Sequence, residues 1–197
     1  MRNVLLVLAL MLTVSLSAQD IKLPQPQKTG GMPLMEALNN RSSSRDFSTE
    51  ELDNQTLSNL MWAAWGINRE DGRRTAPSAS NKQELELYVS MKSGVYKYNA
   101  QDHMLVQVSA QDVRKETGKQ AFVGEAPVNI VFVADETKKG AKDVDAGFIS
   151  QNIYLYCASE GLITVVRLMF DADAVSKALN LSETQVPVLT QTVGKKK

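Results

Sequence analysis

The chain has 197 residues, a length that suits a single domain. Its 43% apolar and 22% charged residues are ordinary for a globular protein and argue against global disorder. Lys plus Arg and Asp plus Glu number 22 each, so the net charge is zero and nothing global indicates a nucleic-acid partner.

The first 18 residues have the pattern of a secretory signal peptide. Arg2 supplies a positive start, residues 4–16 are almost wholly apolar, and Ser17-Ala18 supplies small residues for cleavage. The apolar run is too short for a spanning helix, and an uncut N-terminal anchor is the alternative. We therefore expect an exported, periplasmic protein with no membrane attachment after cleavage.

The next segments read as an arm, a short helix and a loop before a longer helix. Residues 19–31 are rich in Pro, Gly and Gln and predict an extended arm; a domain of residues 32–197 follows it. A short helix is expected over 32–39 and a polar loop over 41–47. Ser48 and Glu51 have capping-box spacing and predict the start of a helix over about 53–65.

A second polar loop, 68–83, precedes a set of strands. Apolar alternation predicts strands over 85–91, 95–98 and 104–108, and a surface helix is expected over 110–117. The continuous apolar run 128–134 is typical of a central strand covered on both faces.

The last third predicts two helices and two strands. Residues 144–160 are apolar nearly all round, which predicts a central buried helix. A strand over 163–166, a helix over 173–179 and a strand over 186–193 follow. The irregular alternation and the hairpins favour an α+β fold with a mostly antiparallel sheet flanked by helices.

The loop sequence R-S-S-S-R at 41–45 is the first candidate site. Two guanidinium groups four residues apart, with three hydroxyls between them, can surround a phosphate. Taken alone, such a loop is a weak signal and is better explained as a solvated surface segment.

The second candidate is the stretch 73–81, R-R-T-A-P-S-A-S-N. Its small residues and Pro77 let the backbone approach a flat ligand, and the Asn81 amide could bond to a ring edge. A flexible surface loop is the alternative. Two such loops, each beside a helix or strand, make a ligand site more plausible than either loop alone.

Other chemistry finds little support in the sequence. Cys157 lies in an apolar stretch and reads as a small buried hydrophobe, and His103 is the single histidine. A metal site built on histidines and a Ser-His-Asp triad are therefore disfavoured. Asp143 and Asp145 are interpreted as helix-capping or surface carboxylates.

In order and spacing, these motifs resemble the nitroreductase superfamily. R-S-S-S-R-D-F before a helix, R-R-T-A-P-S-A before a strand, and G-F-I-S-Q-N-I-Y-L-Y-C-A-S-E-G-L carry the resemblance, which covers roughly residues 32 to 194. The motif sequences are closest to those of the branch of SagB-type dehydrogenases, which oxidise azoline rings in modified peptides. The resemblance implies a homodimer with FMN bound at the interface by parts of both chains.

Residue by residue, the resemblance implies the following roles. Arg41 and Ser43 match positions that bind the FMN phosphate and ribityl chain, Arg45 matches a basic residue near the ribityl or pyrimidine edge, and 166–169 falls where backbone amides face flavin N5. Lys195 could complete the phosphate site, or residues 195–197 could be a frayed tail. The predicted cofactor-binding residues are Arg41, Ser42, Ser43, Arg45, Pro77, Ser78, Ala79, Asn81, Leu168, Met169 and Lys195.

The expected function is an FMN-dependent oxidoreductase that carries two electrons from NAD(P)H to a nitroaromatic, quinone or similar small-molecule acceptor. Leu168 and Met169 replace smaller residues common in the family, and G-K-K-K ends the chain where the branch often has Gly-Tyr-Pro. These departures weaken any analogy of substrate. An exported ligand-binding protein without turnover and a SagB-like azoline oxidase are the alternatives.

Overall fold

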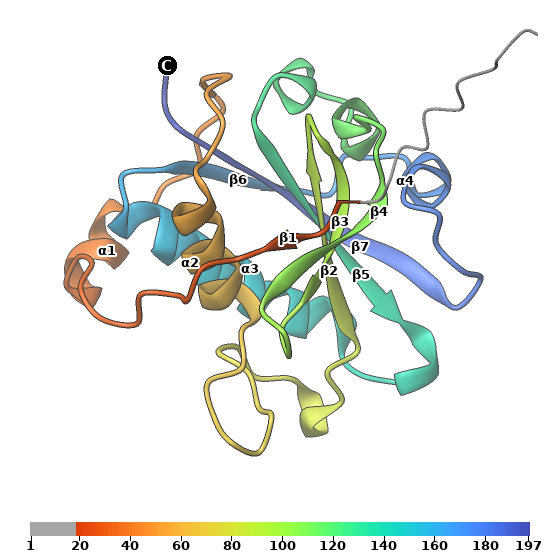
Figure 1. The fold of residues 1–197 in the computed structure, drawn as a ribbon, viewed down its shortest axis with the longest axis horizontal. Coiled ribbons are helices and arrows are strands. Elements are labelled where there is room, and N and C mark those ends of the chain that lie inside the picture. Colours follow the sequence, from red (N-terminus) through yellow and green to blue (C-terminus); the bar gives the residue numbers. More distant parts are fainter. Residues whose placement is uncertain (1–18) are drawn as a thin grey trace, which may run out of the picture.

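A seven-stranded antiparallel sheet forms the middle of the molecule (Figure 1). The computed structural model describes residues 19–197, so the predicted signal peptide lies outside the described residues. The strands lie in the order β1-β4-β3-β2-β5-β7-β6, and every neighbouring pair is antiparallel. Their bounds are β1 Ile21–Lys22, β2 Leu85–Met91, β3 Gly94–Asn99, β4 Met104–Ser109, β5 Val128–Asp135, β6 Ile163–Arg167 and β7 Gln185–Gly194. The α+β prediction is confirmed.

Strand β5 is the centre of the sheet, between β2 and β7. Residues 128–134 are all buried, so the continuous apolar run of this strand reflects cover on both faces, as predicted. The neighbouring β2–β3 hairpin turns tightly before Gly94, whose φ of +136° suits glycine.

Helices cover both faces of the sheet. The long helices α2 (Asn54–Trp65) and α3 (Lys142–Ser159) pack on one face, with α1 (Leu34–Asn40) beside α3. Helix α4 (Ala172–Ala178) covers the opposite face, where Val175 joins a smaller core with Tyr88 and Val131. The sheet is thus the middle of three layers, and its two faces carry separate cores.

Helix α2 begins later than the predicted capping box places it. Its N-cap is Asp53, whose Oδ1 accepts a hydrogen bond from the Thr56 amide at 2.9 Å. The Ser48 hydroxyl accepts from the Glu50 amide at 3.1 Å instead, within a non-helical stretch. The predicted helix over about 53–65 is confirmed, but the capping-box prediction is wrong because the Asp53 carboxylate, and not the Ser48 hydroxyl, accepts the free amide of the first turn.

The predicted surface helix over 110–117 is also wrong. Only a short 3-10 turn, Arg114–Thr117, forms there. Asp112 accepts hydrogen bonds from the backbone amide and the guanidinium of Arg114, which holds the chain in a turn. Thr117 is buried and donates to the Arg114 carbonyl, so this turn packs inward.

Helix α3 is not buried all round, contrary to the prediction from its sequence. Ile149 and Ile153 are fully buried against the sheet, but Val144 and Phe148 on the outer face are 58% and 43% exposed. Helix α1 exposes further large apolar side chains: Leu34, Met35 and Leu38. Exposed apolar surface of this kind marks an interaction site.

The arm that precedes α1 lies along α2. Strand β1 pairs with β4 at the sheet edge, and the Ser58 hydroxyl of α2 donates to the Pro24 carbonyl at 2.6 Å. Further along, the Gln27 amide donates to Asn59 and the Met32 amide donates to Ser159. Side chains of α2 and α3 therefore fix the arm.

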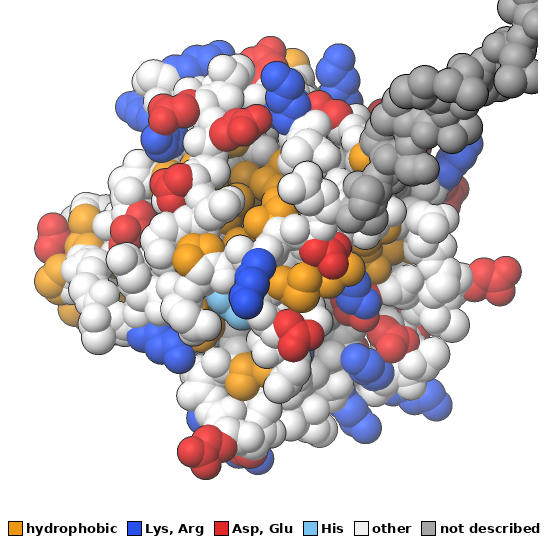
Figure 2. Space-filling model, viewed as in Figure 1, with side chains coloured by type: hydrophobic (Ala, Val, Ile, Leu, Met, Phe, Trp, Pro, Cys, Tyr) orange, Lys and Arg blue, Asp and Glu red, His pale blue; other side chains and the backbone are white. Residues whose placement is uncertain are grey.

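Charged side chains of both signs are scattered over the face shown in Figure 2, in line with the zero net charge. Within residues 19–197, no helix has the length and apolar character needed to cross a membrane.

Replacing Asp53 by Ala tests the position of the helix cap. The variant should lose about 1 kcal/mol of the free energy of unfolding, because the Thr56 amide loses its acceptor. Ser48→Ala is the matched control and should lose clearly less, since Ser48 caps no helix. Urea denaturation of both variants measures the difference; an equal loss would restore the capping-box interpretation.

Candidate cofactor site

The Tyr154 hydroxyl of α3 joins the loop 41–47 to strand β6. It lies 2.7 Å from the Ser43 hydroxyl and accepts a hydrogen bond from the Val166 amide at 3.1 Å. The Arg41 guanidinium lies over the same aromatic ring, 5.2 Å from its centroid. One side chain thus brings together the predicted phosphate loop and the start of the 166–169 segment.

Backbone contacts fix the rest of this loop. The Ser44 amide donates to the Thr164 carbonyl of β6 at 3.1 Å, and Phe47 is buried against Val165. The Ser48 amide then donates to the Lys195 carbonyl at 2.8 Å, and the Lys197 amide donates to the Asp46 carbonyl at 3.0 Å. The C-terminal lysines are therefore paired with the loop, and the alternative of a frayed tail is wrong.

The surface of this loop carries cationic and hydroxyl groups suited to an anion. Ser42, Ser43 and Arg45 are exposed, and Arg41 is half-buried. Within residues 19–197 neither arginine has a carboxylate partner. Lys195 lies beside the loop, with its ammonium paired to Glu50. Guanidinium groups without a carboxylate partner and serine hydroxyls are donors suited to a phosphate; of the two hydroxyls, that of Ser43 is also hydrogen-bonded to Tyr154.

Two exposed apolar residues follow strand β6 directly. Leu168 and Met169 are 77% and 59% exposed, although both are large and apolar. The preceding Arg167 is buried and donates to the Thr117 carbonyl and to the Asn129 side chain, and its burial lowers its pKa to about 10. The chain therefore leaves the sheet firmly held at Arg167 and presents Leu168 and Met169 to the outside.

Residues 77–81 of the second polar loop, which we call the loop 77–81, are held at the other end of α3. The Ala79 amide donates to both carboxylate oxygens of Asp145, at 2.9 and 3.1 Å, and the Ser78 hydroxyl accepts from the Gln83 amide. Pro77, Ala79 and Asn81 are exposed. A tight turn whose exposed side chains include Pro77 and Ala79 leaves room for a flat ligand.

The structure does not bring the two loops together within one chain. Asp145 and Tyr154 are nine residues apart on α3, which corresponds to about 13 Å along the helix axis. Arg41, Ser42, Ser43, Arg45, Leu168, Met169 and Lys195 gather near the Tyr154 end, whereas Pro77, Ser78, Ala79 and Asn81 lie at the Asp145 end. Each chain thus carries two separate groups of predicted site residues, which we call the first and the second candidate half-site.

Sequence reasoning missed the two residues that hold these loops. The sequence pattern placed Tyr154 among the apolar residues of a buried helix, and Asp145 was interpreted as a capping or surface carboxylate. Asp145 is in fact buried, and its carboxylate faces the second loop. A hydroxyl and a carboxylate on the sheet-facing side of an apolar helix were the available signals, because buried polar groups need partners.

Cys157 and His103 do not form a pair. Cys157 is buried, which raises the pKa of its thiol, and the ring nitrogens of His103 lie 2.7 Å from the Ser58 hydroxyl and 3.0 Å from the Tyr98 hydroxyl. Burial also lowers the pKa of His103. No group of three or more His, Cys, Asp or Glu side chains in the described part of the chain could hold a metal ion.

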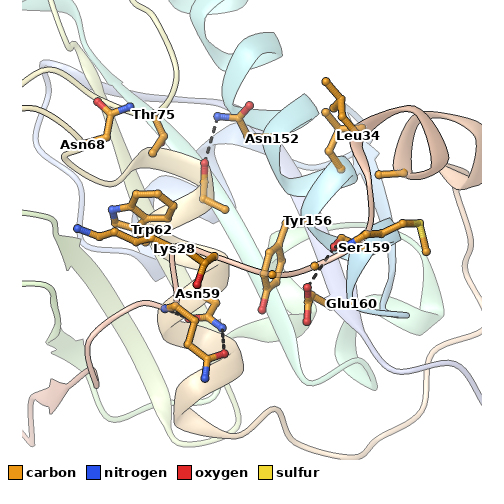
Figure 3. Close-up of a pocket in the computed structure, with 18 residues that line it drawn as sticks. Lys28, Leu34, Asn59, Trp62, Asn68, Thr75, Asn152, Tyr156, Ser159 and Glu160 are labelled. Atoms are coloured by element: carbon orange, nitrogen blue, oxygen red, sulfur yellow. Dashed lines mark hydrogen bonds between the residues drawn. The ribbon is translucent and has the colours of Figure 1, made fainter.

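A cavity of about 490 Å³ lies between the arm, α1, α2 and α3 (Figure 3). The Lys28 ammonium lies 5.5 Å from the centroid of the Trp62 ring, and Asn152 donates to the Ala63 carbonyl in its wall. None of the predicted cofactor-binding residues lines this cavity. Pro77, Ser78 and Asn81 instead line a separate hollow of about 460 Å³, together with Arg73 and Arg74.

Comparisons with known proteins agree on one family. The model of the nitroreductase family matches residues 38–195. A protein of Methanocaldococcus jannaschii named "Putative nitroreductase" is 30% identical over 196 residues, which is 90% of this chain and 96% of that protein. A crystal structure from Ralstonia eutropha, whose protein carries the same description, is 39% identical with a TM-score of 0.86, covering 93% of this chain and 92% of that one.

A more distant structure shows the fold alone. The microcin synthetase McbBCD complex of E. coli contains a chain that is 19% identical, with a TM-score of 0.68, covering 86% of this chain and 76% of that one.

Replacing Tyr154 by Phe should disturb the first half-site. The Val166 amide would lose its acceptor, at a cost of about 1–3 kcal/mol in the free energy of unfolding. Tyr156→Phe is the control, because the Tyr156 hydroxyl only adds a 3.3 Å bond to the Thr56 carbonyl inside α2, and it should cost less. Urea denaturation would contradict this role of Tyr154 if both variants lost the same amount.

Proposed function

The chain belongs to the nitroreductase family of oxidoreductases, and we propose that it holds FMN between two copies of itself. The loop 41–45 and the 166–169 segment would come from one chain and the loop 77–81 from its partner. The observation that carries this proposal is the separation of the two loops at opposite ends of α3, each fixed by a buried side chain.

The outer face of α3 supports a homodimer. Val144, Gly147, Phe148 and Gln151 form an exposed stripe between the two half-sites. A two-fold axis across the middle of this stripe would place the Asp145 end of one helix beside the Tyr154 end of the other. The dimer would then contain two complete sites, each formed by the first half-site of one chain and the second half-site of the other. The exposed apolar side chains of α3 would be covered.

The residues of the first half-site fit the phosphate of FMN. Arg41 and Arg45 supply guanidinium groups without carboxylate partners, and Ser42 and Ser43 supply hydroxyls. Lys195 adds a cation at the same end once its ammonium leaves Glu50. In the proposed arrangement Arg45 provides positive charge along the flavin, which favours the reduced anionic form.

FMN supplies two-electron transfer between a donor and an acceptor. The residues of this chain bind and orient it, and they shape the space for the substrates. Leu168 and Met169 would narrow that space with apolar surface, which favours flat, apolar acceptors such as quinones or nitroaromatics. NAD(P)H is the proposed electron donor, by analogy with the family. Within that family, the motif sequences favour the SagB-type branch.

Residues 1–18 remain our prediction of a signal peptide, so the proposed location is the periplasm. The native chain purified from a periplasmic extract should be yellow, with flavin absorbance that NADH bleaches and an acceptor restores. Arg45→Glu should lose FMN, because it places a carboxylate where the proposed arrangement needs positive charge along the cofactor, whereas Lys177→Glu, on α4 at the opposite face of the sheet, should retain it. A colourless wild-type protein that does not bind added FMN would refute the proposal.

Mixing two variants tests whether each site uses two chains. Arg45→Glu damages the first half-site and Ala79→Glu the second, so neither homodimer should bind FMN. A heterodimer of the two would contain one intact site and one doubly damaged site, and should bind one FMN per two chains.

Differently tagged chains, co-expressed and purified through both tags, give that heterodimer. Absorbance of the bound flavin then measures the occupancy. No recovery of FMN binding in the heterodimer would mean that both loops act within one chain.

A further inference from the structure

The loop 77–81 depends on a single buried anchor. Asp145 is 1% exposed, and its carboxylate accepts the Ala79 amide with both oxygens. Ser80, Asn81 and Gln83 all have positive φ, between 46° and 54°, a conformation that side-chain-bearing residues rarely adopt. Such backbone strain persists only where neighbouring contacts impose it. Asp145 supplies such a contact at Ala79, while Lys138 and Arg74 donate hydrogen bonds to Gln83.

A second carboxyl group, Glu84, interacts electrostatically with Asp145 and packs against Gly140, just before the start of α3. Glu84 follows the loop directly and is 1% exposed, and neither of its carboxylate oxygens has a hydrogen-bond partner. Gly140 covers it so closely that an added Cβ would lie 2.0 Å from the Glu84 carboxyl carbon. An ionised carboxylate in this position would be buried, unsolvated and next to another negative charge.

We propose that Glu84 and Asp145 share a proton and that this carboxyl pair positions the loop 77–81 for FMN. Asp145 lies in the first turn of α3, where negative charge is stabilised, and it accepts the Ala79 amide. The Glu84 carboxyl is protonated, and its O–H donates a hydrogen bond to the Asp145 carboxylate. This bond gives a buried Glu84 oxygen a partner. The inference rests on the proposed function, because it assigns this loop to the flavin.

The charges around Glu84 leave the pair uncompensated. Lys138 donates to the Gln83 carbonyl at 3.0 Å, and Lys142 pairs with Glu136 at 2.5 Å. The remaining charged groups lining the adjacent hollow are Asp135, Lys139 and Asp143. Two of the three lysines are therefore already engaged, and the acidic groups outnumber the free cation.

The pair makes the loop sensitive to pH. Burial raises the pKa of Glu84, the neighbouring Asp145 raises it further, and Lys138 lowers it. Because the folded state favours the protonated form, the stability that this proton provides is present at low pH and is lost as pH rises through the folded-state pKa. Deprotonation places two negative charges together, which should loosen the hold of Asp145 on Ala79.

The test measures FMN affinity by fluorescence quenching and Ala79 amide protection by hydrogen exchange, both from pH 4 to 9, a range that begins below the ordinary pKa of a glutamate. In the wild type, both should fall as pH rises. Glu84→Gln should match the wild type at the low end and stay constant above it, because its amide donates to Asp145 at every pH. Asp145→Ala should weaken FMN binding at least tenfold throughout, since the anchor is gone.

Asp53→Asn is the matched control: its carboxylate also accepts a backbone amide at a helix start, but far from the loop in sequence. It should leave FMN affinity and its pH dependence unchanged. An identical pH profile for Glu84→Gln and the wild type, with Ala79 equally protected in both, would overturn the inference.

The two proposals fail separately. A wild type that binds no FMN, while Ala79 protection still falls with pH and Glu84→Gln removes the change, would refute the flavin site and leave the carboxyl pair standing. FMN binding with pH-independent protection in the wild type would refute the pair alone. Because the exchange measurement uses the whole apoprotein, the result does not depend on any loaded cofactor.

Discussion

Helix α3 is the element on which both candidate half-sites depend. Its sheet-facing side is an apolar surface that fixes the helix, and two polar groups on that buried side, Asp145 and Tyr154, reach outward to one loop each. A buried polar side chain needs a partner, and here the partners are backbone or hydroxyl groups of otherwise irregular segments. Asp145 and Tyr154 in this way hold two irregular loops against the rigid core.

Much of the fold follows from patterns within single segments. The continuous apolar run of β5 predicts a strand covered on both faces, and the alternation before Gly94 predicts the β2–β3 hairpin, because strand burial has a period of two. Errors arise where two local signals compete. Ser48 and Asp53 are both good caps, and only the packing of α2 against the sheet decides between them. Asp112 captures Arg114 and stops a helix that composition alone favours.

The candidate site was less predictable for a different reason. The residue types of the two loops can be recognised as anion and flat-ligand binders, but Tyr154, Asp145 and Glu84 act through partners far away in sequence. The prediction that Phe148 is buried was wrong, because the sequence does not show whether an apolar side chain is covered by its own chain or by a second one. Contacts between distant segments or between chains leave no local pattern.

A site divided between two chains links cofactor binding to assembly. If FMN contacts both copies, it binds the dimer and not the monomer, so bound flavin stabilises the dimer and dilution favours loss of both. The same reasoning would give a role to the exposed stripe on α3: in the proposed dimer, apolar contact at Phe148 would supply association energy, while the loops at Asp145 and Tyr154 would supply the ligand contacts. In that arrangement a domain of this size would need no additional subdomain to enclose a cofactor, because a second copy would provide the missing wall.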